Sequence, residues 1–222
     1  MIHRTSCKTL PRLAASTMAT LLMAAALGGC GLFLVGGAVV GSGLVYTDRR
    51  TTGTQIEDEA IELKAASRVR ELATLGHVNM VSYNRTVLIT GEVPRDAEKA
   101  AVEQAVARIE NVRAVVNELG VGQNSSLGSR STDAFIGGKV KATMVDAKDV
   151  QANAYKVVVE RAVVYLMGRV SEREAARGVE IARSISGVQK VVRVVEVLSE
   201  DELAKLGRSA APAAAASGVS PR

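Results

Sequence analysis

The residue types that most often carry chemistry at neutral pH are sparse in this chain. Residues 30–222 contain one histidine, His77, with no cysteine or second histidine near it to complete a zinc site. No serine lies in a Gly-x-Ser-x-Gly segment, and Glu57, Asp58 and Glu59 fall together where a helix is expected to begin. Acidic side chains there suit the helix dipole and solvent. We therefore expect a non-enzymatic protein without metal or cofactor, with His77 at a helix end or turn.

The cysteines suggest membrane attachment instead. Residues 1–12 hold three basic side chains, residues 13–27 are apolar, and Leu27-Gly28-Gly29-Cys30 follows, which is typical of a lipoprotein signal sequence. We predict a signal peptide over 1–29, with acyl chains such as palmitate on Cys30 and a tether over 30–53. An uncleaved membrane helix remains the alternative, because residues 31–45 are also apolar.

Composition limits the remaining possibilities. The 222 residues are 47% hydrophobic but only 3% aromatic, which favours two small layered domains over one large core with a deep pocket. The net charge is +5, and loss of the three basic residues before Cys30 leaves +2. The basic character therefore gives no support for nucleic-acid binding.

An internal repeat defines the domain organisation. Residues 87–97 and 164–174 share an apolar run, a glycine, a charged residue, a valine and a helix-start signal, at an offset of 77. Gly91 and Gly168 occupy equivalent places, where we expect a structural turn with a positive φ or a close approach between helix and sheet.

The pattern around each copy predicts helix, hairpin, helix and strand. The fold class is therefore α+β, with two tandem αββαβ units, each a three-stranded mixed sheet packed on two helices. We place the first domain at 54–122, a linker at 123–130 and the second domain at 131–200, with Ser131 or Thr132 capping its first helix. The Ala/Pro/Ser-rich tail over 201–222 is expected to be disordered.

These features resemble a known family. The segment Tyr46 to Gln55, the two glycine-centred stretches and Ser186-Gly187-Val188 are similar to BON domains, and two copies behind a lipobox look like outer-membrane lipoproteins of the DolP type. The resemblance implies a lipid-anchored protein that faces the periplasm and supports envelope integrity. It also implies anionic phospholipid as a partner, and outer-membrane assembly or cell-wall remodelling proteins as further candidates.

In that family the phospholipid-binding face lies on the first helix of the second domain. The matching residues here are Phe135, Ile136, Lys139, Val140 and Lys141. Charge supports the same domain independently: residues 54–122 hold 8 basic and 11 acidic residues, a net −3, whereas residues 131–198 hold 11 basic and 8 acidic, a net +3.

Two alternatives stay open. The apolar members of the set, with Met144, could instead form the core face of an amphipathic helix. The protein could also be a periplasmic structural or chaperone-like module that binds protein partners through strand edges or through the acidic helix of the first repeat.

Overall fold

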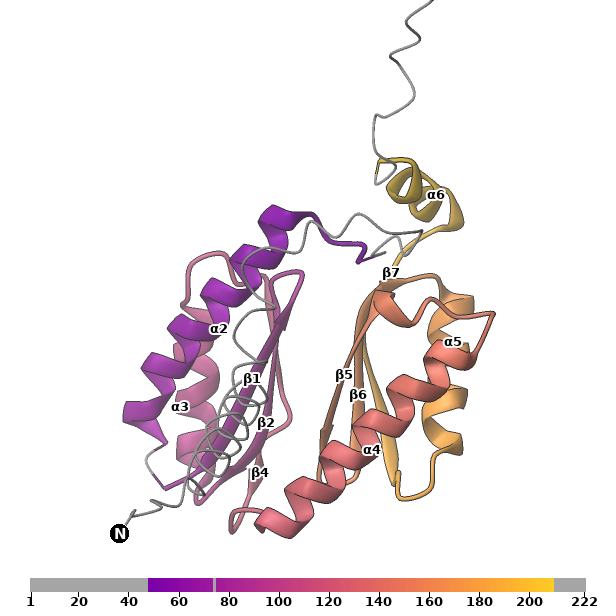
Figure 1. Ribbon diagram of the computed structural model, residues 1–222. Helices are drawn as coiled ribbons and strands as arrows, with labels where there is room; N and C mark the ends of the chain where they lie inside the picture. The colour runs from indigo at the N-terminus through magenta and orange to yellow at the C-terminus, as the bar shows by residue number, and fades with distance from the viewer. Residues whose placement is uncertain (1–47, 74, 210–222) are drawn as a thin grey trace, which may run out of the picture. The chain divides into compact units, whose positions relative to one another are not determined.

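The computed structural model describes residues 48–73 and 75–209 of the chain (Figure 1). The predicted signal peptide, Cys30 and most of the tether lie outside these residues. Among the helices that are described, none has the length and apolar character needed to cross a membrane. The described residues belong to one compact unit.

The first repeat is a mixed sheet with two helices. Strands β1 and β2 form an antiparallel hairpin, and β3 and then β4 run parallel to β2 along its other edge. The sheet thus has three strand positions, because β3 and β4 follow one another on the same side of β2. The elements are α2 (Thr52–Leu72), β1 (His77–Tyr83), β2 (Thr86–Val93), α3 (Asp96–Ala107), β3 (Ala114–Asn117) and β4 (Gly120–Val121).

The second repeat has the same topology. Strands β5 and β6 are antiparallel, and β7 runs parallel to β6 after a helical crossover. Its elements are α4 (Leu127–Asp146), the 3-10 turn η3 (Ala152–Ala154), β5 (Tyr155–Glu160), β6 (Val163–Val170), α5 (Glu172–Ser184) and β7 (Lys190–Val197). The predicted αββαβ order and mixed three-stranded sheets are confirmed for both repeats.

Each repeat buries an aliphatic core between its helices and one face of its sheet. In the first, Ile61, Ala65 and Val69 follow one another at four-residue spacing on α2 and meet Val87 and Ile89 of β2. The second core is built in the same way from helices α4 and α5 and the sheet. Alternate strand residues point away from the helices, and those of both sheets share a third cluster that includes Tyr83, Leu88, Tyr165 and Met167.

The segment before α2 adds polar contacts to both repeats. The Arg49 guanidinium donates to both carboxylate oxygens of Glu174 at 2.7 Å, and that of Arg50 donates to Asp58 at 2.8 Å. Arg50 also lies 4.2 Å from the centre of the Tyr83 ring. All four charged side chains are largely buried, so this segment contacts α2, the first hairpin and α5 together.

Two element boundaries differ from the expectation. Helix α4 begins at Leu127, inside the predicted linker, because the Ser126 hydroxyl accepts a hydrogen bond from the amide of Ser129 and caps the helix. Ser131 and Thr132, the predicted caps, instead donate to backbone carbonyls one turn earlier.

The predicted disordered tail is also shortened by a helix. Residues 200–209 form α6, which begins after Ser199. The Ser199 hydroxyl accepts from the Glu202 amide at 3.3 Å, while the Glu202 carboxylate accepts from the Ser199 amide at 2.8 Å. This reciprocal cap holds the first turn, and the expectation of disorder from residue 201 was wrong for 201–209.

The repeated glycines lie inside strands, two residues before each strand ends. Gly91 has φ of +108°, and a Cβ there would meet the carbonyl of His77 on β1. Gly168 has no positive φ, but a Cβ there would meet the carbonyl of Ala154 beside β5. The close approach is thus to the neighbouring strand at Gly91 and to the end of the turn η3 at Gly168, and in neither case to a packed α-helix.

Candidate functional site

Helix α4 is the element on which the sequence placed the candidate site. Asp133, Ile136, Val140 and Met144 form its buried face, spaced three or four residues apart. The helix continues without interruption through Gly137 and Gly138. A single face is therefore committed to the core, and the opposite face is presented outward.

The outward face carries large apolar side chains. The relative exposures of Leu127, Phe135 and Val145 are 79%, 65% and 64%. At 100° per residue, Leu127 and Val145 point in the same direction, Phe135 lies about 80° away, and exposed Ala134 and Ala142 fall beside or between them. We call these five residues the α4 stripe. Grouped apolar exposure of this kind is typical of a surface that contacts something apolar.

Basic charge borders the α4 stripe. The Lys139 ammonium lies 4.4 Å from the centre of the Phe135 ring, where the electron-rich face of the ring attracts it. Between Leu127 and Val145 the only acidic residue is Asp133. Its buried carboxylate accepts the backbone amides of Arg161 and Ala162 at 2.8 Å each. The outward face thus combines apolar side chains with a cation and carries no carboxylate over this length.

The predicted binding residues separate into three groups. Phe135 and Lys139 are exposed on the outward face. Ile136 and Val140, at 3% and 0% exposure, belong to the core of the second repeat and cannot reach a ligand without unfolding α4. For these two the core-face alternative holds, and the structure corrects their assignment to the binding face.

Lys141 has a different role again. Its ammonium group donates to the backbone carbonyls of Ala152 and Tyr155, at 2.5 and 2.9 Å, and so fixes the turn η3 to α4. Burial lowers the pKa of Lys141 below its ordinary value. Its side chain is therefore occupied within the fold, and the exposed cation on this part of the helix is Lys139.

Sequence reasoning missed Leu127 and Val145. Both share the helical phase of Ala134, so a helical projection starting at residue 127 finds them. The helix was expected to begin only at Ser131 or Thr132, which excluded Leu127, and Val145 was outside the matched family positions. The cap at Ser126 is the signal that corrects the first omission.

The acidic trio and His77 were interpreted as surface or turn residues, and the structure corrects two of them. Asp58 is 2% exposed and its carboxylate accepts hydrogen bonds from the Ser82 hydroxyl and the amides of Asn84 and Arg85, at 2.7 to 2.8 Å. It holds the first hairpin turn as Asp133 holds the second. His77 is the first residue of β1 and not a helix-end or turn residue, and burial followed by the charge of Arg130 lowers its pKa.

Metal-binding geometry is not found in the part of the chain that is described. Residues 48–73 and 75–209 contain no group of three histidine, cysteine, aspartate or glutamate side chains placed to hold a metal ion. The buried carboxylates of Asp58 and Asp133 accept structural hydrogen bonds on both of their oxygens. The chemistry available at α4 is that of binding, through an apolar stripe and a cation.

Comparison with known proteins agrees with this architecture. The outer membrane lipoprotein DolP of Haemophilus influenzae is 39% identical over 191 residues, which cover 82% of this chain and 99% of that protein. The 21 kDa hemolysin of Actinobacillus pleuropneumoniae is 32% identical over 151 residues, 67% of this chain and 78% of that protein. Both likenesses extend across the two repeats and are not confined to a short motif.

Solved structures give a weaker likeness. CdsD, a structural protein of the type III secretion system of Chlamydia trachomatis, aligns with a TM-score of 0.28 and 13% identity over 69% of this chain and 97% of that one. The CdsD C-terminal domain aligns with a TM-score of 0.27.

The family model described as the BON domain matches residues 57–123 and 132–199, one match for each repeat. This chain therefore belongs to the BON-domain family, as a dual-BON protein of the DolP type.

Proposed function

We propose that this protein is a lipid-anchored outer-membrane protein whose second BON domain docks on anionic phospholipid through the α4 stripe and Lys139. The observation that carries the proposal is the 65% exposure of Phe135 beside the Lys139 ammonium. Anchoring is assigned to Cys30, because this cysteine follows the predicted signal peptide and the chain is similar to an outer membrane lipoprotein. The protein acts by binding, faces the periplasm and supports envelope integrity, without catalytic turnover.

The physical chemistry of a membrane surface fits this arrangement. Burying an aromatic or aliphatic side chain fully contributes roughly 1.5–3 kcal/mol, and each lysine near an anionic surface adds about 1 kcal/mol. One helix face can supply both contributions, because the α4 stripe would enter the acyl boundary while Lys139 stays at the headgroups. Binding free energies of this size suit a reversible contact between α4 and the membrane. A lipid anchor on the same chain would keep the domain near the surface and make the contact persistent.

Vesicle flotation tests the docking. A fragment of residues 46–222, which includes all of the described residues, is mixed with vesicles of phosphatidylcholine alone or with phosphatidylglycerol added. We expect recovery with the anionic vesicles, and we expect Phe135→Ser and Lys139→Glu each to reduce it at least fivefold. Ile56→Ser is the matched control, since Ile56 is 62% exposed on α2 of the first domain. Equal recovery with both kinds of vesicle would remove the proposal.

Labelling with radioactive palmitate tests the anchor separately. The full chain expressed in a Gram-negative host should incorporate label, and Cys30→Ala should not. Label in the variant equal to that in the parent would exclude Cys30 as the attachment site. The two experiments are independent, because the flotation fragment lacks Cys30.

A further inference from the structure

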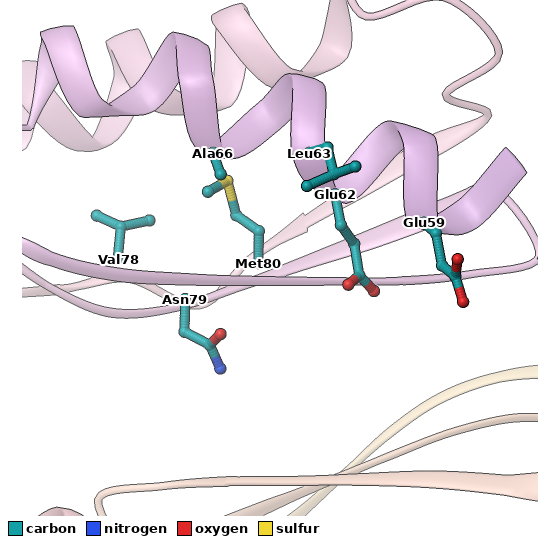
Figure 2. A pocket seen from close by; sticks show the side chains of 7 residues that line it. All are labelled: Glu59, Glu62, Leu63, Ala66, Val78, Asn79 and Met80. Atoms are coloured by element: carbon teal, nitrogen blue, oxygen red, sulfur yellow. The ribbon is translucent and has the colours of Figure 1, made fainter. Parts of the chain in front are cut away.

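A groove runs along the first domain between helix α2 and strand β1. Figure 2 shows Val78 and Met80 pointing from β1 toward Leu63 and Ala66 of α2, while Asn79 points away from the helix. This part of the groove has a volume of about 460 Å³. A second hollow of about 360 Å³ shares Ala66, Val78 and Met80 with it and continues toward Arg70 and His77. The groove therefore follows β1 along most of its length.

Strand β1 is also the free edge of its sheet. The strand order is β1-β2-β3, so β1 has a partner on one side only. The hairpin closes at the pair Tyr83 and Thr86, and its two turn residues have positive φ of 49° and 64°. In such a hairpin the closing pair is hydrogen-bonded, so the backbone groups of Ser82, Met80 and Val78 point away from β2.

One of those three positions is already satisfied, and two are open. The Ser82 amide donates to a Glu62 carboxylate oxygen at 2.7 Å. Over residues 48–73 and 75–209, the backbones of Val78 and Met80 make no hydrogen bond outside the β1–β2 ladder. Their N–H and C=O groups thus offer the pattern that an added strand requires, directly beside the groove.

The charge at the groove indicates which kind of ligand it would bind. Glu59 stands exposed at its rim and forms no ion pair within the described residues, while Glu62 is paired with Lys156 at 2.9 Å. The floor is apolar, and Leu63 above it is 74% exposed. A free carboxylate disfavours an anionic lipid, and a second copy would bring together two domains of charge −3. A segment with apolar side chains and one cation would match both the apolar floor and the free Glu59 carboxylate.

We propose that this groove binds an extended segment of a partner protein, which adds a strand beside β1. Apolar side chains of that segment would cover Ala66 and Met80, its backbone would pair with Val78 and Met80, and a lysine or arginine would lie against Glu59. This interaction surface belongs to the first domain and uses none of the residues assigned to phospholipid.

A defined peptide tests the proposal on the full-length chain held in phosphatidylcholine nanodiscs. The probe has nine residues with valine at positions two, four and six, arginine at position eight and threonine elsewhere. Binding is followed by fluorescence anisotropy of the labelled probe. Hydrogen–deuterium exchange of the protein reports where it binds, and we expect new protection of residues 77–83.

Variants with matched controls localise the site. Ala66→Trp, which fills the groove from an exposed helix position, should weaken binding at least tenfold. Arg68→Trp, which is exposed and lies about 200° around the same helix, should change it less than twofold. Glu59→Lys should also cost at least tenfold, with Glu71→Lys as its control. A probe with glutamate in place of arginine should bind Glu59→Lys better than it binds the parent protein.

Several outcomes overturn the proposal. They are no binding at millimolar probe, unchanged affinity in Ala66→Trp, protection outside residues 77–83, and protection of 77–83 by phosphatidylglycerol nanodiscs without peptide. The last would assign the groove to lipid. A concentration-dependent dimer that Ala66→Trp abolishes would instead assign the groove to a second copy of the chain.

Discussion

Replacing Asp58 with asparagine should strongly destabilise the first domain, although the side chain lies in the first turns of a helix. The carboxylate is 2% exposed and accepts four hydrogen bonds, from the Ser82 hydroxyl, the Asn84 and Arg85 amides and the Arg50 guanidinium, at 2.7 to 2.8 Å. Asparagine keeps one acceptor oxygen and turns an NH2 group toward donors. At least two of the buried donors would then lack a partner.

The magnitude follows from these contacts. A hydrogen bond to a charged group contributes roughly 1.5–3 kcal/mol, and removing one partner from a buried ion pair costs about 3–5 kcal/mol. We expect a loss of about 3 kcal/mol in the free energy of unfolding, since Arg50 keeps its contacts with Asp48. For a chain of this size that corresponds to a fall in Tm of roughly 6–12 °C.

The effect should depend on pH in a defined direction. Burial alone would raise the pKa of Asp58, but the hydrogen bonds from Ser82, Arg85, Arg50 and Asn84 together lower it below the ordinary value of 3.8. A carboxyl whose folded pKa lies below its unfolded pKa contributes stability above the unfolded value and loses it as pH falls through the folded value. The difference in Tm between parent and variant should be constant from pH 7 to 5 and shrink below about pH 4.

Thermal and urea unfolding of the full chain, followed by circular dichroism, measures both quantities. Asp96→Asn is the control, because Asp96 is exposed at the start of α3 and its side chain makes no hydrogen bond or ion pair within the described residues. A loss below about 0.5 kcal/mol in Asp58→Asn, equal to that of an ordinary surface substitution, would refute the argument. So would a Tm difference that grows as the pH is lowered.

Three further predictions concern stability. Gly168→Val should unfold the second domain, because its Cβ would meet the Ala154 carbonyl, and an unchanged Tm would contradict this. Arg49→Ala and Glu174→Ala should show a coupling of about 1–2 kcal/mol in a double-mutant cycle, since their two 2.7 Å contacts are largely buried; additive losses would contradict it. Lys141→Met should cost about 1–3 kcal/mol by removing the ammonium donor from two carbonyls, of which that of Ala152 keeps only the Tyr155 amide, yet preserve recovery in flotation, and lost flotation with full stability would overturn that assignment.

Much of the fold could be predicted from the sequence because its signals are local and occur twice. The alternation of apolar residues in the strands, the helical spacing of the core positions and the two glycines at offset 77 define the αββαβ order. The Ser126 and Ser199 caps show the limit of that approach. Single hydroxyl contacts set where α4 and α6 begin, and composition had placed both regions in a linker and a tail.

The candidate site was only partly predictable for a geometric reason. Phe135, Ile136 and Val140 have similar hydropathy, so the sequence could place them on one helix but not divide them between its two faces. The packing of α4 against its sheet makes that division, and buries Ile136 and Val140 while leaving Phe135 exposed. Lys139 and Lys141 differ in the same way, because only Lys141 lies within reach of the carbonyls beside η3.

The sequence by itself determined that two like units follow one another and that the second is the more basic, since pattern and charge are properties of the chain. Tertiary structure decided which side chains of those units remain available. The Asp58 carboxylate accepts hydrogen bonds from the backbone of a hairpin turn, whereas Glu59 next to it lies exposed beside an open strand edge. One of two neighbouring residues is buried and the other exposed because a helix turns about 100° per residue, and only packing against the sheet fixes which direction is inward.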